Sequence, residues 1–429
     1  MGNNYVTGMT SKVTLLPYMG ECHFEGTEEH RSSRCQSINR GGVAKASVMY
    51  IVEDIGVTSF NVSVHLIGPN FTQSLQSQIS EDHVVLAADL ENAVNSMYLV
   101  KPGFWDVSVY RFRPNGSQVL ADMIVRMTGN NSEELIAVLR EAVKSGNIGD
   151  ITVEPGYYHE NIIVACPPDF NKVSWLAMPA STVRFQRCPQ NATGISRRRC
   201  GAAGNWSMAD FNECLDPRIE ALRNKVDRLL NSSSSSTADV NEVLTSLSSV
   251  TTPQKGAAPM GREDIRVSGL ILQGIVTYIE RRDNGAVTNP ETIKQFFQAS
   301  SNLLNYNNKK QLIQLQKSNS SATELALTIE KFASQAAQGL DPSIRVSKQF
   351  ITSNLAIGVT SVPAGFDSNV RFPDYSDPIF ASSPTWGNYG ENYVIIPSSA
   401  FNQSPKQENG SKIASIIFKT LSSFLDVKR

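Results

Sequence analysis

The chain has 429 residues, of which 41% are hydrophobic, and its formal net charge is −1. This length allows about two to four domains, and the hydrophobic content excludes a chain that is disordered throughout. The near-zero net charge gives no electrostatic reason to expect nucleic acid or anionic lipid as a partner.

Asn-x-Ser/Thr sequons are more frequent in this sequence than chance gives. They lie at Asn61, Asn70, Asn115, Asn130, Asn191, Asn205, Asn231, Asn319, Asn402 and Asn409, and the one at Asn402 is weakened by Pro405 directly after its serine. The six cysteines are an even number, as in a disulfide framework. Together these features predict an extracellular, glycosylated, disulfide-bonded protein.

Targeting and anchoring segments are not recognisable in the sequence. The first residues have neither the basic nor the apolar region of a signal peptide, and the best apolar stretch, residues 270–279, is too short to span a membrane. We therefore expect the chain to be a fragment of a longer, cell-surface protein.

Residues 1–56 are polar and rich in glycine, and they predict a tail with a small disulfide loop between Cys22 and Cys35. His23 and His30 lie close to these cysteines, so a zinc site is the alternative interpretation. The sequons favour the disulfide, because they place the chain in an oxidising compartment.

Residues 57–156 alternate between strand and helix patterns. Hydrophobic residues recur at every second position in 60–66, 105–109 and 119–125, and residues 148–153 form a last short strand pattern. Helical spacing follows Ser80, a plausible cap, and runs from Ser132 to a stop at Gly146. The order β-α-β-β-α-β predicts a ferredoxin-like arrangement with two helices on one face of a four-stranded sheet.

This order, together with the run from Phe112 to Met123, resembles a SEA domain. Some SEA domains cut themselves at a Gly-Ser peptide in the turn of this run, and the resemblance implies Gly116 and Ser117 as that pair. Aligning the strand that follows instead places Gln118 at the serine position, one residue out of register.

Residues 160–215 predict a small module held together by disulfides, because so short a segment has little core. Its four cysteines are Cys166, Cys188, Cys200 and Cys214, with Trp175 and Trp206 between them. Three pairings are possible, and the sequence alone does not choose among them. A zinc site is disfavoured because the segment has no histidine and no Cys-x₂-Cys pair.

The order of these residues resembles the hormone-receptor (HormR) motif domain. The matching positions are Trp175 through Pro179, Cys188-Pro189, Gly194, Arg198-x-Cys200, Gly204-x-Trp206 and Cys214. The resemblance implies the pairs Cys166–Cys200 and Cys188–Cys214. It also implies one of two roles, peptide-hormone binding or a structural spacer, of which we favour the spacer.

Residues 216–342 show helical spacing, beginning at the cap-like pair Asp216-Pro217. Helices are predicted at 237–250, 263–282, 290–305 and 321–338. After Pro342 the pattern changes to strands, including 354–359 and 393–396. Helices followed by strands, directly after a hormone-receptor motif, resemble a GAIN domain: its helical subdomain A at 216–342 and an incomplete subdomain B, the start of a β-sandwich, at 343–429. The family's self-cleavage tripeptide is not in this sequence.

No enzyme motif occurs in the sequence, and His159-Glu160 is a solitary pair that fits a surface loop better than a catalytic dyad. We therefore predict no enzymatic activity, no cofactor and no metal. The module order predicts a multi-domain α+β fragment of an adhesion G protein-coupled receptor. It would engage an extracellular protein or matrix ligand and signal to a heterotrimeric G protein through a seven-helix membrane domain outside this chain. A secreted or matrix-associated interaction protein is the alternative.

Overall fold

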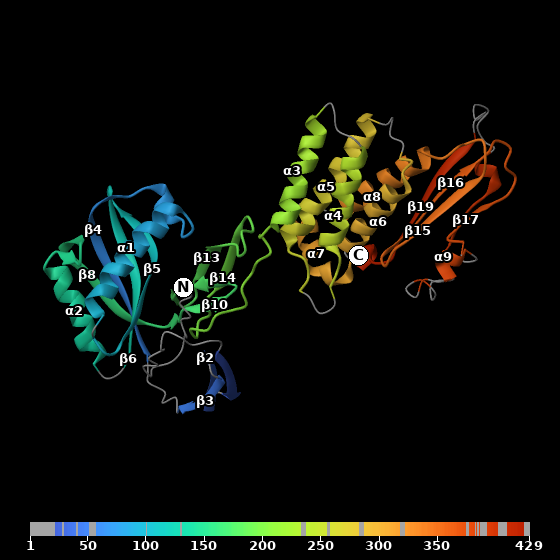
Figure 1. Ribbon diagram of the computed structural model, residues 1–429. Coiled ribbons are helices and arrows are strands. Elements are labelled where there is room, and N and C mark those ends of the chain that lie inside the picture. The colour runs from blue at the N-terminus through green and yellow to red at the C-terminus, as the bar shows by residue number, and fades with distance from the viewer. Residues whose placement is uncertain are drawn as a thin grey trace. The chain divides into compact units, whose positions relative to one another are not determined.

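The computed structural model divides into two compact units, which are described separately (Figure 1). Its described residues are 22–27, 30–39 and 42–50 (backbone only), 57–99, 101–128, 131–232, 237–254, 258–282, 287–317, 322–374, 377–381, 383, 386, 393–401 and 410–423. The first unit holds residues 1–187 and 197–210, and the second holds 188–196 and 211–429. The division thus falls inside the cysteine-rich segment rather than at either of its ends.

The centre of the first unit is a five-stranded antiparallel sheet. Its strands are β4 (Val57–Asn70), β5 (Phe104–Asn115), β6 (Gln118–Thr128), β7 (Asn147–Ile148) and β8 (Ile151–Ile163), in the spatial order β5-β6-β4-β8-β7. Helices α1 (Glu81–Tyr98) and α2 (Ser132–Lys144) cover one face of this sheet, and a 3₁₀ turn, η1 (Gln73–Gln76), precedes α1 (Figure 1). Among the described residues of this unit, no helix lies on the other face.

Local sequence signals explain most of these elements. Ser80 caps α1, because its hydroxyl oxygen accepts a hydrogen bond from the amide of His83 at 3.2 Å. The alternating hydrophobic residues of β4, including Val62 and Val64, are fully buried beneath the helices. The last strand differs from the prediction: it runs to Ile163, ten residues beyond the predicted end, because pairing with β4 continues past an irregularity in register.

Three N-terminal strands, β1 (Cys22–Thr27), β2 (His30–Asn39) and β3 (Gly42–Tyr50), form an antiparallel sheet in that order. Cys22 and Cys35 are Cα partners where β1 pairs with β2. The side chains of this sheet lie outside the described part of the chain, so the Cys22–Cys35 disulfide and its zinc alternative stay predictions.

The cysteine-rich module consists of short strands joined by turns. They are β9 (Ala165–Cys166), β10 (Asp169–Asn171), β11 (Val173–Trp175), β12 (Met178–Pro179), β13 (Val183–Arg187) and β14 (Ile195–Arg199), paired β9 with β12, β10 with β11 and β13 with β14. Within the first unit, Cys166, Met178 and Cys200 pack against Tyr110 and Ile124 on the helix-free face of the sheet. One end of that face is therefore covered by the module.

The second unit begins with a helical bundle. Its helices are α3 (Pro217–Asn231), α4 (Thr237–Thr251), α5 (Arg262–Arg282), α6 (Pro290–Leu303), the 3₁₀ turn η2 (Tyr306–Asn308), α7 (Lys309–Lys317) and α8 (Ala322–Gln338). Asp216 and Asn289 cap α3 and α6, each followed by proline at the first helical position. The predicted helices are present, and α7 was not predicted.

A sheet of β15 (Val346–Ile351), β16 (Leu355–Val362) and β19 (Ser411–Phe418) follows, in the order β15-β16-β19. The remaining elements are β17 (Val370–Phe372) paired with β18 (Val394–Ile396), the short helix α9 (Pro378–Ala381), and the 3₁₀ turns η3 (Ser398–Ala400) and η4 (Leu421–Ser423). All eight residues of β16 are buried. Ile357 and Val359 join the core of the helical bundle, whereas Ala356 packs with Phe372 and Trp386 on the other side.

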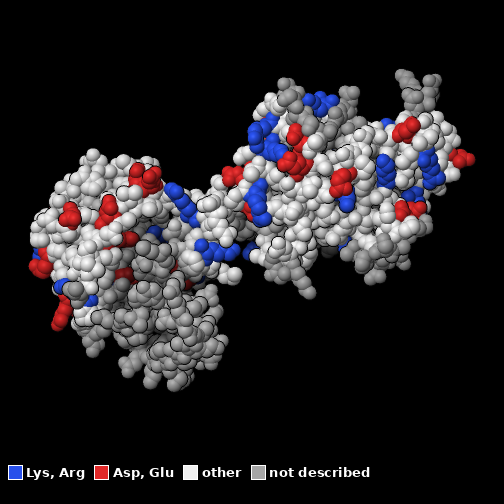
Figure 2. Space-filling model, in the orientation of Figure 1, with Lys and Arg blue, Asp and Glu red and all other residues white. Residues whose placement is uncertain are grey.

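The distribution of charged and apolar residues gives two further observations. Acidic and basic side chains are interspersed on the visible face of the second unit, and no large area there carries one sign (Figure 2). Among the described residues, no helix is both long enough and apolar enough to cross a membrane.

Candidate ligand-binding face of the first unit

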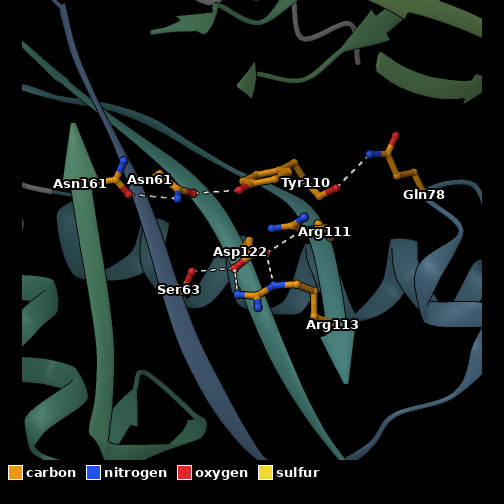
Figure 3. Close-up of polar contacts among 8 residues, drawn as sticks. All are labelled: Asn61, Ser63, Gln78, Tyr110, Arg111, Arg113, Asp122 and Asn161. Carbon is orange, nitrogen blue, oxygen red and sulfur yellow. Dashed lines mark hydrogen bonds and ion pairs between the residues drawn. The ribbon is translucent and has the colours of Figure 1, made fainter. Parts of the chain in front are cut away.

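A row of polar residues crosses four neighbouring strands on the helix-free face of the sheet. Arg111 of β5 pairs with Asp122 of β6, Asp122 pairs with Ser63 of β4, and Ser63 pairs with His159 of β8. Arg113, two residues after Arg111 in β5, donates a hydrogen bond to the same carboxylate (Figure 3). Because paired residues in an antiparallel sheet point to the same side, the row forms one continuous polar surface.

Asp122 is the centre of this row and is 1% exposed. Its carboxylate accepts hydrogen bonds from Ser63 Oγ at 2.6 Å, from Arg111 Nε at 2.7 Å and from Arg113 Nε and Nη2 at 2.7 and 2.8 Å (Figure 3). Burial alone would raise the pKa of Asp122, but the hydrogen bonds from Arg113, Ser63 and Arg111 together lower the pKa. The carboxylate is therefore ionised at neutral pH.

Two guanidinium groups thus share one carboxylate, which leaves a local excess of one positive charge. The side chains of Arg111 and Arg113 are 55% and 37% exposed, whereas that of Asp122 is buried beneath them. Their bonds to Asp122 hold both groups in fixed positions while other N–H donors remain. Such an arrangement can bind an anionic group, a carboxylate or a sulfate, from solution.

A second polar row lies beside the first, next to the part of the face that the cysteine module covers. Tyr110 donates its hydroxyl hydrogen to Asn61 Oδ1 at 2.9 Å, and Asn61 Nδ2 donates to Asn161 Oδ1 at 3.2 Å (Figure 3). Gln78 donates to the Tyr110 carbonyl oxygen at 2.9 Å and accepts a hydrogen bond from the amide of Phe185 at 3.0 Å. This row ties the module to the sheet.

The module itself is organised around Arg198. Its guanidinium carbon lies 5.9 Å from the ring centroid of Trp175 and 5.2 Å from that of Trp206, and its Nη1 donates to Asp169 at 2.5 Å. The two tryptophan rings are tilted by 50° and do not stack on each other. An arginine between two aromatic rings thus supplements the small core of the module.

Two disulfides complete the module. Cys166 is bonded to Cys200 and Cys188 to Cys214, which is the pairing that the resemblance to the hormone-receptor motif implies. Each disulfide lies within one of the two units, the former in the first and the latter in the second. All four cysteines are buried.

The suggested self-cleavage pair lies in the hairpin between β5 and β6. Asn115 pairs with Gln118, so Gly116 and Ser117 are the two central residues of a tight turn. Gly116 has a φ of 62°, which costs glycine nothing and matches the first central position of a type II′ turn. Ser117 accepts a hydrogen bond from the amide of Phe71 at 2.8 Å. Nothing in the backbone of this turn is strained, so its geometry does not favour the self-cleavage that the resemblance suggests.

Of the ten sequons, six lie at described asparagines. Five of these are exposed: Asn70, Asn115, Asn191, Asn205 and Asn231. Asn61 is half-buried in the middle of β4, and both polar atoms of its side chain are hydrogen-bonded. Asn130, Asn319, Asn402 and Asn409 lie outside the described residues, and occupancy at every sequon stays a prediction.

A polar hollow of about 260 Å³ lies in the second unit, next to the start of α3 and α5. On its wall, Asp264 accepts a hydrogen bond from the amide of Asp216 at 2.7 Å, and burial raises the pKa of Asp264 to about 6. Asp264 therefore acts as a structural tie between two helix starts. Within the described ranges, no group of three or more His, Cys, Asp or Glu side chains could hold a metal ion.

Sequence reasoning did not find the centre of the polar row. The clue was present: Arg111 and Arg113 occupy alternate positions of one strand, and Asp122 interrupts an otherwise hydrophobic strand. A charged residue in such a strand indicates a partner of opposite charge on a neighbouring strand. The sequence does not state which strand that is.

Two family models match the chain. The SEA domain model matches residues 58–153, and the model described as "AGRL2-4 GAIN subdomain A" matches residues 219–337. These matches coincide with the sheet of the first unit and with the helical bundle of the second. The segment between them is matched by neither model.

Curated relatives of this chain include adhesion receptors. Adhesion G protein-coupled receptor B3 of Mus musculus is 25% identical over 276 residues, which are 62% of this chain and 17% of the relative. Adhesion G-protein coupled receptor F3 of Homo sapiens is 32% identical over 84 residues, which are 20% of this chain and 8% of the relative. The chain thus spans less than a fifth of the length of either relative.

One solved structure, described as "Full extracellular region of zebrafish Gpr126/Adgrg6", matches 91% of this chain and 49% of its own chain. The identity is 13% and the TM-score is 0.31.

Proposed function

Because this chain carries a SEA domain and a GAIN subdomain A and is related to the adhesion G protein-coupled receptors, we propose that it is the ligand-engaging part of such a receptor's extracellular region. In this proposal it lies on the outer side of the plasma membrane. It binds an extracellular protein or matrix ligand and passes the resulting signal or force to a seven-helix membrane domain. A heterotrimeric G protein is a partner only through that domain.

The observation that supports ligand engagement is the polar row around Asp122. Its exposed arginines form a preorganised, positively charged surface on a rigid sheet, and the neighbouring part of the face is already occupied by the cysteine module. The ligand that fits this surface presents carboxylate or sulfate groups. The cysteine module, in contrast, acts as a spacer, since part of it is used in packing against the sheet.

The test compares matrix binding of charge variants of the full chain. Wild-type protein is titrated onto cell-deposited extracellular matrix alongside Arg111→Glu and Lys144→Glu. Lys144 is a matched control, because its side chain is 59% exposed at the end of α2, on the helical side of the sheet. We expect Arg111→Glu to weaken binding about tenfold or more and Lys144→Glu to leave it unchanged.

Arg111→Glu loses its bond to Asp122 and is less stable, so a cooperative unfolding transition well above the assay temperature is required of all three proteins to show that the fold is retained. The proposal fails if the wild type does not bind saturably or if both variants bind as the wild type does. The alternative, a secreted or matrix-associated interaction protein, predicts the same binding. It is separated by sequencing the full-length transcript, which in the receptor encodes seven apolar spans after Arg429.

A further inference from the structure

The two disulfides of the cysteine module overlap along the chain. The cysteines occur in the order Cys166, Cys188, Cys200, Cys214, and the bonds join the first to the third and the second to the fourth. Neither closed loop therefore lies inside the other. When the chain is pulled from both ends, these bonds carry the force and shorten the covalent path between the ends of the module.

Cys166 follows the last strand of the SEA domain, and Cys214 precedes the first helix of the bundle by three positions. Without disulfides, the 48 positions between them could extend to about 165 Å at about 3.4 Å per residue. With both disulfides, the shortest covalent path passes from Cys166 across the bond to Cys200 and then along 14 positions to Cys214. That path extends to only about 50 Å.

The neighbouring parts of the chain have no such limit. Residues 57–165 and 215–429 contain no cysteine, so noncovalent packing alone holds the sheet and the helical bundle. Both can be pulled out to their full length.

The ends of the short path are anchored in different units. Cys166 and Cys200 are fully buried with Tyr110 and Ile124 of the sheet. Close to Cys214, Glu213 pairs with Arg262 at 2.9 Å, tying this end to the start of α5. Because the cysteines are buried, dissolved reductants have little access to the bonds.

We propose that the cysteine module is a tension coupler of limited length. It passes a pulling force from the SEA domain to the helical bundle, and its own fully stretched length is at most about 50 Å. The biological role of this property rests on the receptor function proposed above. The two bonds are not equivalent: Cys166–Cys200 sets the length limit, and loss of Cys188–Cys214 leaves the shortest path unchanged.

The test is single-molecule stretching of the full chain, tethered at both ends, up to complete unfolding. We compare the final length of the wild type with those of Cys188→Ser/Cys214→Ser, Cys166→Ser/Cys200→Ser and the variant with all four replacements. Cys22 and Cys35 are present in every protein, so their contribution cancels. The fully stretched length does not depend on whether a variant folds, so poor folding of a variant does not obscure the result.

We expect Cys188→Ser/Cys214→Ser to match the wild type. In Cys166→Ser/Cys200→Ser the path runs from Cys166 to Cys188 and then across the remaining bond, which adds eight positions, or about 27 Å. The fourfold variant gains the full 34 positions, about 115 Å. In the wild type, the cysteine module itself contributes no step longer than about 50 Å.

The proposal is overturned if the wild type reaches the length of the fourfold variant, or if Cys166→Ser/Cys200→Ser has the wild-type length. Matrix binding plays no part in these lengths. A failure of the receptor function and a failure of the coupler are therefore distinguishable.

Discussion

Arg184 of the cysteine module donates a hydrogen bond from Nη1 to the carbonyl oxygen of Val109 in β5, and the two atoms are 3.2 Å apart. The backbone amide of Val109 donates a hydrogen bond to Glu91 Oε1 of α1 at 2.7 Å. Arg184 is 4% exposed, and burial lowers its pKa to about 10. The junction between module and sheet thus contains two titratable groups that bind the backbone of one residue, Val109.

Glu91 makes the stability of the first unit depend on pH. Burial raises its pKa to about 7, against 4.5 in the unfolded chain, so the folded state binds a proton that the unfolded state releases in this range. The stability it contributes is complete below about pH 4.5 and is lost as the pH rises through 7. The loss amounts to about 3 kcal/mol at most.

We therefore expect Glu91→Gln to flatten this dependence, since the amide oxygen still accepts the Val109 hydrogen bond without titrating. Urea unfolding at pH 5 and pH 8 gives the free energy of unfolding at each pH. This free energy should fall from pH 5 to pH 8 in the wild type and should fall less in the variant. Identical pH profiles would contradict the assignment to Glu91.

Asp122→Asn is expected to destabilise the first unit by about 3 kcal/mol, because two guanidinium groups would lose their shared negative partner. The pKa of Asp122 is lowered in the fold, so its contribution is present above about pH 4 and is lost as the pH falls further. Chemical denaturation at pH 7 measures the loss. Asp150→Asn, at an exposed position of the same domain, serves as the control. If both variants lose the same free energy of unfolding, the ion pairs of Asp122 do not stabilise the first unit.

Much of this fold was predictable where the determining signal is local. The cap at Ser80, the proline starts of α3 and α6 and the alternation in β4 are each encoded within a few residues. The contacts of Arg184 and Asp122 were not predictable, because their partners lie in other strands and strand patterns do not specify which strands pair. The disulfide pairing came from resemblance and not from spacing.

Self-cleavage at Ser117 is not expected, although the resemblance to SEA domains suggested it. The turn around Gly116 places its positive φ on glycine, and Ser117 is held by its hydrogen bond to Phe71. A denaturing gel of purified protein should show one full-length band. Smaller bands that disappear in Ser117→Ala would show that the hydroxyl does attack the preceding carbonyl.

Glycan mapping should distinguish Asn61 from the exposed sequons. Asn70 and Asn205 are exposed and should carry glycans in protein from a secretory host. Asn61 should be unmodified, because its Nδ2 donates to Asn161 and its Oδ1 accepts from Tyr110 beside the packed module. Deglycosylation in heavy-oxygen water followed by mass spectrometry reads each site. High occupancy at Asn61 would mean that this face of the sheet opens more widely than the contacts imply.

Amide hydrogen exchange should be slow in β16 and fast in β18, two strands of the C-terminal region. An incomplete β-sandwich exposes unpaired strand edges, which on its own favours a loosely ordered region. β16, however, is buried on both faces, by the helical bundle and by Phe372 with Trp386, and it lies between β15 and β19. Its amides should therefore be among the slowest of the second unit. The amides of β18, whose residues Val394 and Ile395 are about half exposed, should exchange at least about a hundredfold faster. Uniform protection of both strands would show that further contacts cover β18, and uniform lack of protection would show that the sheet does not hold without additional strands.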